Sequence, residues 1–167
     1  MNEDQINRLP PDVKKQFLKY ALKLSEKKTK TKVHDDFMTF VKHVWPEFIE
    51  GRHHKEIAEK FNQIARGEIK RLIINMPPRH TKSEFASFLL PSWMVGRKPN
   101  LKIIQTTHTT ELAIRFGRKA KTLMDSQEYK QVFSTRLRED SQAAGKWETE
   151  QGGEYYAAGV GSAITGR

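Results

Sequence analysis

Hydrophobic residues recur at every third or fourth position over residues 3–26, a spacing that predicts an amphipathic helix. Pro10 and Pro11 interrupt this pattern and split the helix into two pieces. The pattern stops at the sequence KKTKTK, residues 27–32, which contains no hydrophobic residue and therefore predicts a charged linker. We expect residues 1–34 to form a helical N-terminal appendage that ends in this basic linker.

Two more helical patterns cover residues 35–49 and 53–66. Gly51 and Gly67 follow them, and glycine at such a position is a signal that a helix ends. In both segments the apolar side chains share one helix face, which is the face that packs on a core. These helices open a second domain, which we expect to extend over residues 35–167.

Short runs rich in β-branched residues predict strands over residues 69–76 and 100–107. Helical patterns follow each of them, over residues 82–96 and 110–133. Strands that alternate with helices favour parallel βαβ construction. We therefore expect an α/β fold with a parallel sheet core behind the helical N-terminal segment.

A β-hairpin is predicted near the end of the chain, where the glycine pair at 152–153 separates residues 147–149 from residues 154–158. The acidic pair at 139–140 follows a polar loop and no apolar run, so it lacks the position after a buried strand that a catalytic acidic pair has in enzymes that hydrolyse nucleotides.

Composition adds a strong positive charge to this picture. The 167 residues carry a formal net charge of +10, and the pI is about 9.8. This balance favours an anionic partner such as nucleic acid, and a solvated lysine-rich surface explains it equally well. The chain contains no cysteine, which excludes disulfides and thiolate metal sites. No apolar run reaches the roughly 18 residues of a membrane span, so we expect a soluble intracellular protein.

The stretch between the first predicted strand and its helix resembles a phosphate-binding loop that has lost its glycines. The pattern G-x-x-x-x-G-K-[ST] falls on residues 76–83, where Lys82 and Ser83 match and Met76 and Thr81 replace the glycines. Glycines let such a loop turn tightly and bring backbone N–H groups close to phosphate. Two readings therefore stay open: a phosphate-binding loop, or a Pro-Pro turn in which Ser83 caps a helix.

The position of the loop before a helix favours phosphate. Free N–H groups and the positive end of the helix dipole would face it. Lys82 would reach terminal phosphates, the Ser83 hydroxyl would bind Mg²⁺, and the Arg79 guanidinium would add a second cation.

Three segments around this loop resemble the ATPase domain of phage large terminase subunits, the motors that package viral DNA. They are RLIINMPPRHTKSEFASFLLPSWMVG (71–96), NLKIIQTTHTTELAIRFGRKAKTLM (100–124) and GGEYYAAGVGSAITGR (152–167). The likeness covers roughly residues 35–167 and is weak before them. It implies a P-loop NTPase-type core, here partial, that binds ATP and Mg²⁺.

The resemblance also implies roles for individual residues. Lys82 would bind the β- and γ-phosphates, Ser83 the magnesium, and Arg79 would lie near the γ-phosphate, so Lys82 and Arg79 are the candidate catalytic residues. His53 and His54 lie where the family places its adenine-contacting motif, although a partly exposed helix start accounts for them equally well. The candidate nucleotide-binding residues are Pro78, Arg79, His80, Thr81, Lys82, Ser83, His53 and His54.

The implied function is ATP hydrolysis that drives double-stranded DNA into a viral procapsid, in the cytoplasm of the host cell. The family implies a portal protein, a small terminase subunit and a homo-oligomeric ring as partners, and no membrane. The family's acidic Walker B strand would begin after Arg167. We therefore expect a fragment of a longer protein that lacks the nuclease domain and is inactive as an ATPase by itself.

Two alternatives remain open. One is a helicase-type P-loop ATPase, and the other is a non-enzymatic basic DNA-binding or assembly module in which the loop is only a turn. Cations on the second long predicted helix would follow a DNA backbone or form a solvated face: Arg115, Arg118, Lys119 and Lys121. None of the six histidines has the spacing of a metal motif.

Overall fold

The computed structural model describes residues 10–162, which form seven α-helical or π-helical segments and a four-stranded sheet. In chain order the elements are α2 (Pro11–Asp35), α3 (Phe37–Val44), α4 (Arg52–Arg66), η1 (Glu84–Leu89), α5 (Leu90–Arg97), β1 (Lys102–Thr107), α6 (Thr110–Asp125), α7 (Gln127–Val132), β2 (Leu137–Ala143), β3 (Lys146–Thr149) and β4 (Glu154–Gly159). The predicted α/β class is confirmed. None of the helices in this part of the chain combines the length and hydropathy needed to cross a bilayer.

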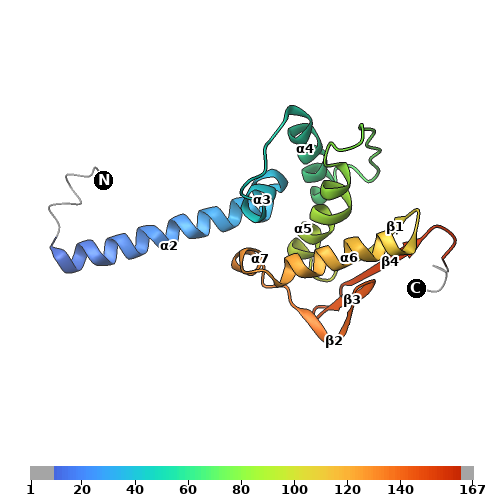
Figure 1. Cartoon of the computed structure of the whole chain (residues 1–167). Helices are drawn as coiled ribbons and strands as arrows, with labels where there is room; N and C mark the ends of the chain where they lie inside the picture. Colours follow the sequence, from blue (N-terminus) through green and yellow to red (C-terminus); the bar gives the residue numbers. More distant parts are fainter. Residues whose placement is uncertain (1–9, 163–167) are drawn as a thin grey trace.

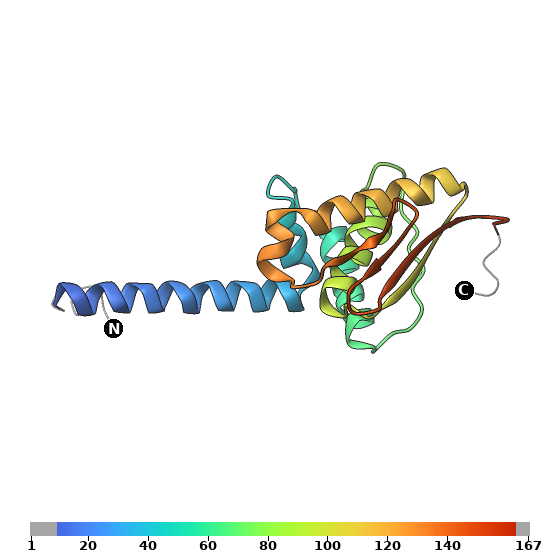
Figure 2. The same cartoon turned by 90° about the horizontal axis from the view of Figure 1, so that it is seen from below.

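The first described helix, α2, projects from the body of the protein as a straight shaft (Figures 1 and 2). It begins at Pro11, where the missing proline N–H costs nothing, and its 25 residues include residues 27–32. The predicted linker is therefore wrong. Lysine is a good helix former and the run contains no glycine or proline, so charge alone did not end the helix. The division into two domains stays a prediction.

The helical core is built around Phe37. Its ring lies edge-on to Phe61, Phe85 and Trp93, at centroid distances of 5.0, 5.4 and 5.4 Å. The buried Asn62 accepts a hydrogen bond from the Phe37 N–H at 2.8 Å, which ties α4 to the start of α3. Helices α3, α4, α5 and the π-helical η1 thus share one aromatic core.

The sheet has the strand order β1-β4-β3-β2, in which β1 and β4 are parallel and the other pairs antiparallel. The strand predicted at 100–107 and the predicted hairpin are confirmed. Strand β2 was not predicted from the sequence, because its consecutive charged residues 138–140 give no apolar alternation. The sheet is consequently mixed, and only its β1–β4 pair has the parallel arrangement expected for the core.

Helix α6 covers one face of the sheet. Gly117 allows the close approach, because a Cβ there would lie 2.5 Å from the Ala144 carbonyl oxygen. The Gly117 carbonyl accepts a hydrogen bond from the Trp147 indole N–H at 3.3 Å. The Trp147 ring stacks on the Tyr155 ring with a centroid distance of 4.7 Å. These contacts join α6 to the hairpin.

The strand predicted at residues 69–76 does not form. This segment is extended, and its side chains alternate between exposed and half-buried from Arg71 to Met76, but no ladder joins it to the sheet in the described structure. Its half-buried side chains pack against the core, while Ile73 is 85% exposed. The predicted parallel pairing with residues 100–107 is also wrong, because β1 pairs with β4 instead.

Candidate functional site

The loop after this extended segment leads directly into a helical turn. Lys82 and Ser83 are the first helical residues, and the Phe85 N–H donates to the Thr81 carbonyl at 3.0 Å. The N–H groups of residues 82–84 therefore have no helical carbonyl behind them. They point toward the loop, as the sequence predicted for a helix start at this position.

Two non-glycine residues of the loop adopt the left-handed conformation. Arg79 has a φ of 64° and Thr81 a φ of 57°. The conformation costs an L-residue roughly 1–2 kcal/mol, and it is least tolerable for a β-branched residue such as threonine. Thr81 occupies the second glycine position of the phosphate-loop pattern, so the loop takes a glycine-like backbone path without glycine.

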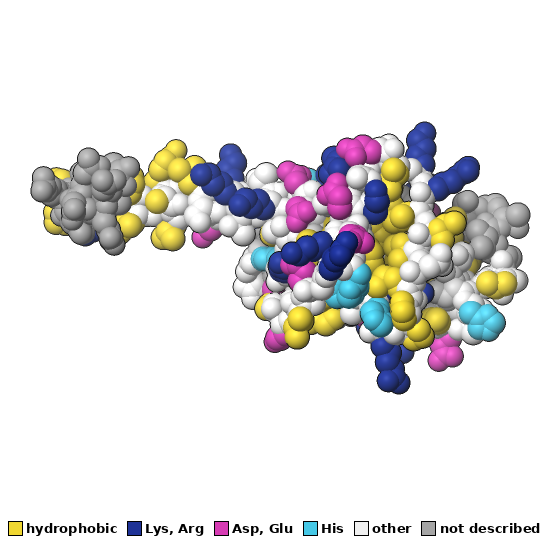
Figure 3. Space-filling model, turned by 90° about the horizontal axis from the view of Figure 1, so that it is seen from above, with side chains coloured by type: hydrophobic (Ala, Val, Ile, Leu, Met, Phe, Trp, Pro, Cys, Tyr) yellow, Lys and Arg dark blue, Asp and Glu magenta, His cyan; other side chains and the backbone are white. Residues whose placement is uncertain are grey.

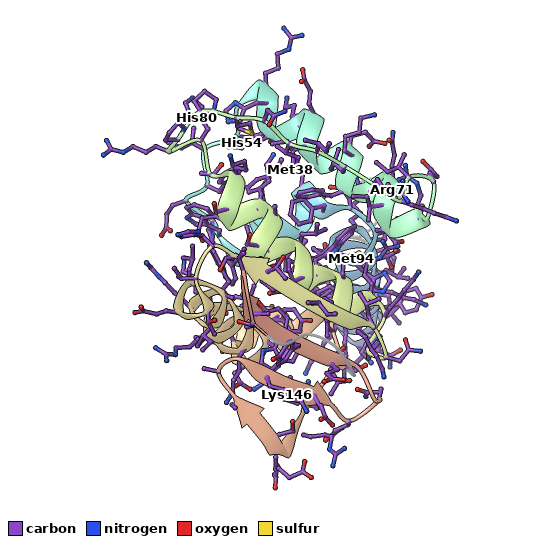
Figure 4. All side chains as sticks on the ribbon, turned by 90° about the vertical axis from the view of Figure 1, so that its right-hand side faces the viewer. Met38, His54, Arg71, His80, Met94 and Lys146 are labelled. Atoms are coloured by element: carbon purple, nitrogen blue, oxygen red, sulfur yellow. The ribbon has the colours of Figure 1, made fainter. Side chains whose placement is uncertain are left out.

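His54 holds Thr81 in this conformation. Its Nε2 lies 2.7 Å from the Thr81 hydroxyl oxygen, and its Nδ1 accepts a hydrogen bond from the Gly51 N–H at 2.8 Å. Because Nδ1 accepts, the imidazole is neutral with its proton on Nε2, which donates to Thr81. The Thr81 hydroxyl in turn donates to the His80 carbonyl at 2.7 Å. Figure 4 shows His54 and His80 on the same side of the molecule, close to one another.

His54 is itself positioned by burial at the start of α4. It is 6% exposed, and its ring lies 4.8 Å from Phe48 and 5.1 Å from Phe85 between centroids. This histidine is therefore a buried clamp on the loop, and not an exposed helix end. The adjacent His53 ring is 3.8 Å from that of His54 and 5.7 Å from that of His80.

We expect the strain at Thr81 to be measurable as stability. Thr81→Asn should raise the free energy of unfolding by about 1 kcal/mol, because asparagine tolerates the left-handed region. Thr81→Val should lower it by about 1–2 kcal/mol, because valine keeps the strain and leaves the buried His54 without its partner. Urea unfolding of both variants measures the difference. Equal stabilities for the two variants would contradict the clamp.

The clamp also predicts a pH dependence. Burial lowers the pKa of His54 below its usual 6.5, and the neighbouring His53 and His80 lower it further, against the opposing charge of Glu50. Below about pH 6.5 the unfolded chain binds a proton at this position that the folded chain does not. Stability should therefore fall as the pH drops from 6.5 toward the lowered value.

His54→Gln tests this dependence, because glutamine keeps a hydrogen-bond donor and acceptor but does not titrate. Urea unfolding between pH 7.5 and 5.5 should give a shallower loss of stability for the variant than for the wild type. Parallel curves for the two proteins would show that another group is responsible.

Cations border the hollow over the loop, whose volume is about 500 Å³ and which residues 76–84 line. The Lys82 ammonium folds back across it and donates to the Met76 carbonyl at 3.4 Å. The Arg79 side chain is exposed beside it. His80 Nδ1 lies 2.9 Å from the Pro78 carbonyl oxygen, a contact within the loop. The hollow thus offers two cations and free backbone N–H groups to an anion.

A second, more apolar hollow of about 360 Å³ adjoins the first at Met76. It lies between α4 and the extended segment, and His53, Ile57 and Ile74 are among the residues that line it. His53 Nε2 is buried without a hydrogen-bond partner within residues 10–162, which is uncommon for a polar atom. The sequence predicted Ile57 and Ile74 only as apolar positions of a helix and a strand, and no motif placed them at the site.

The carboxylate that directly follows the loop is already engaged in an ion pair. Glu84, directly after Ser83, is held by the Lys119 ammonium at 2.7 and 2.8 Å from its two oxygens. The described residues also contain no cluster of three or more histidine or acidic side chains that would hold a metal ion. Ser83 is exposed and contributes a hydroxyl only.

No protein-family model, curated protein or solved structure matches the chain. The chemistry of the two adjoining hollows is therefore the basis for assigning a function.

Proposed function

We propose that the chain binds ATP at the loop formed by residues 76–83, as the ATP-binding part of a viral DNA-packaging terminase motor. The observation that carries the binding proposal is the backbone of this loop. It accepts the strain of two left-handed residues, Arg79 and Thr81, immediately before a helix that starts with Lys82. Strain of this kind persists where a loop is shaped for a ligand.

The proposed roles of the residues follow from their positions. The N–H groups of residues 82–84 would bind phosphate oxygens, and Lys82 would leave the Met76 carbonyl for the β- and γ-phosphates. Arg79 would contact the γ-phosphate with its planar guanidinium. His80 and Pro78 would shape the rim of the loop, and Thr81 would hold its turn.

The adjoining apolar hollow suits the adenine base. It shares Met76 with the loop, so one ligand would span both hollows. Apolar walls with a few polar groups are typical of sites for aromatic ligands. His53 Nε2, which has no hydrogen-bond partner among the described residues, would supply a hydrogen bond to the base, whereas His54 would act only through Thr81.

Magnesium fits this site as an ion that arrives with the nucleotide. Mg²⁺ retains waters and takes phosphate oxygens together with one or two protein oxygens, and the Ser83 hydroxyl is the protein oxygen available here. When bound, the ion would neutralise charge on the phosphates. Hydrolysis needs in addition a carboxylate that orients water, and the nearby Glu84 is bound by Lys119. We therefore expect this chain to bind ATP with little turnover.

The link to DNA packaging rests on the resemblance of three sequence segments to large terminase subunits. In that role, ATP hydrolysis would drive double-stranded DNA into a procapsid, in a ring of subunits that contacts a portal protein and a small terminase subunit in the host cytoplasm. A helicase-type ATPase would use the same loop, so ATP binding alone does not separate the two motors.

A competition titration tests the binding proposal. A fluorescent ATP analogue should bind the chain, and ATP, ADP and inorganic triphosphate should displace it, whereas adenosine should not. Mg²⁺ should strengthen the binding, because it reduces the repulsion between phosphate oxygens. If adenosine displaced the analogue and inorganic triphosphate did not, the loop would be rejected as a phosphate site. The absence of any binding at millimolar nucleotide would reject it as well.

A basic DNA-binding module is the second candidate, and α6 favours it. Arg115 and Arg118 both line two adjoining hollows of about 480 and 550 Å³ along this helix, and neither forms an ion pair among the described residues. Figure 3 shows Lys and Arg side chains distributed over the body and α2. Each arginine that neutralises a phosphate adds about one to the magnitude of the slope of log K against log salt concentration.

DNA binding through α6 therefore has a defined signature. Arg115→Ala combined with Arg118→Ala should lower the salt slope of duplex binding by about two, measured by anisotropy at several salt concentrations. Lys70→Ala combined with Arg71→Ala serves as a control that removes the same two charges from the exposed side of the extended segment. An unchanged slope would identify the α6 cations as a solvated face.

A further inference from the structure

The shaft of α2 carries a row of apolar side chains, of which three are exposed and one, Phe17, is half-buried. Val13, Phe17, Tyr20 and Leu24 follow each other at intervals of four, three and four residues, which places them on one face of the helix. Val13, Tyr20 and Leu24 are 46, 63 and 41% exposed. We call these four residues the α2 seam.

The α2 seam faces away from the side on which the helix meets the body. Only Val33 of α2 is buried, and its carbonyl accepts a hydrogen bond from the Trp93 indole N–H at 3.2 Å. Val33 follows Val13 by 20 residues, or roughly 5.6 turns, so the two side chains leave the helix on opposite sides. Packing on the body therefore cannot cover the seam.

An alternating spacing of four and three is the repeat of a coiled coil, in which such a row packs against a second helix. A free helix gains little stability from propensity alone, and a partner helix would supply the missing packing. We propose that the α2 seam docks an amphipathic helix of another protein whose flanking positions are acidic. This inference is independent of the nucleotide site, because α2 and the loop are separate surfaces.

Charge selects this occupant. Helix α2 holds eight lysines against three carboxylates, and the positions that flank the seam include Lys14, Lys23 and Lys28. A second copy of the chain would place lysine opposite lysine at these positions, which opposes pairing. A partner with Glu or Asp at the same positions would form ion pairs instead.

The shape of the apolar surface also favours a helix over a lipid bilayer. An interfacial helix needs a broad apolar face opposite a polar one. On α2 the seam is narrow, and Leu18 and Leu22, which are 46 and 64% exposed, lie on the other side of the helix.

The test uses two synthetic helical peptides of about four heptads with the same leucine seam, one with glutamate and one with lysine at the flanking positions. The full chain should bind the glutamate peptide at least tenfold more tightly than the lysine peptide, by anisotropy at low salt. High salt should weaken this preference, because the flanking lysines are exposed to solvent. Equal binding of both peptides, or no binding of the glutamate peptide, would overturn the proposal.

Matched variants locate the binding on the helix. Phe17→Asp with Leu24→Asp should lower the affinity for the glutamate peptide at least tenfold. Leu18→Asp with Leu22→Asp, on the other side of the helix, should change this affinity less than about twofold. Phe17→Ala with Leu24→Ala provides a milder pair, and circular dichroism verifies that each variant keeps its helix content. Equal losses for both faces would overturn the assignment of the seam.

Charge reversal gives the most specific result. Lys23→Glu and Lys28→Glu together should reverse the preference, so that the lysine peptide binds better than the glutamate peptide. Sedimentation of the chain alone and binding to anionic vesicles distinguish the other occupants. Self-association or vesicle binding that depends on Phe17 and Leu24, without binding of the glutamate peptide, would assign the seam to a second copy or to a membrane.

Discussion

Lys82→Ala should lower the affinity of the chain for ATP by roughly 30- to 100-fold, which corresponds to about 2–3 kcal/mol. The reason is that the ammonium is the only lysine charge that lies across the loop hollow among its lining residues, where it now contacts the Met76 carbonyl. That contact is long, at 3.4 Å, so its loss should cost little stability. Titration with a fluorescent ATP analogue and urea unfolding measure the two effects separately.

Lys98→Ala is the matched control for this experiment. It removes the same charge at the other end of the helical segment that Lys82 begins, where Lys98 is exposed after α5. The control should bind ATP as the wild type does, apart from a small change caused by net charge. Equal affinity of the Lys82 variant and the wild type would reject the phosphate-loop reading and leave the DNA-binding module as the better candidate.

Phe37→Ala should destabilise the protein by about 3–5 kcal/mol, the cost of removing a large buried aromatic side chain and leaving a cavity. Phe37 is fully buried and contacts Phe61, Phe85 and Trp93 edge-on, so the variant loses packing to three elements at once. Domains have a total stability of about 5–15 kcal/mol, and the variant should therefore unfold at much lower urea.

Phe17→Ala makes the same substitution on the α2 shaft. Because Phe17 lies outside the aromatic core, its loss should cost less than about 1 kcal/mol in the isolated chain. Urea midpoints of the two variants, compared with the wild type, measure the difference. Similar losses at the two positions would show that α2 contributes to the core more than its exposure indicates.

Local pattern was sufficient for much of the fold. The helical spacing predicted α4, which places its apolar residues on one face and ends at Gly67, and it predicted the start of α6. The single helix expected over residues 110–133 is instead divided at Ser126 into α6 and α7. The glycine pair at 152–153 predicted the hairpin of β3 and β4 for a similar local reason. These features depend on residues that are close in the sequence.

Other features depended on distant neighbours, and there the sequence interpretation was wrong. Residues 69–76 have the alternation of a strand, but a strand also needs a neighbour for its backbone groups, and β1 pairs with β4. Residues 27–32 were read as a linker because of their charge, whereas the helix continues through them to reach the body at Val33. Strand β2 forms because β3 offers it an edge.

The candidate site shows the same division. The sequence by itself determined that Lys82 and Ser83 start a helix directly after a turn, because the spacing of apolar residues and the two prolines set that boundary. Only the tertiary structure showed how a loop without glycine adopts a left-handed backbone conformation. The strained backbone at Thr81 is held by His54, 27 residues away, and no local pattern records a hydrogen bond made across the fold.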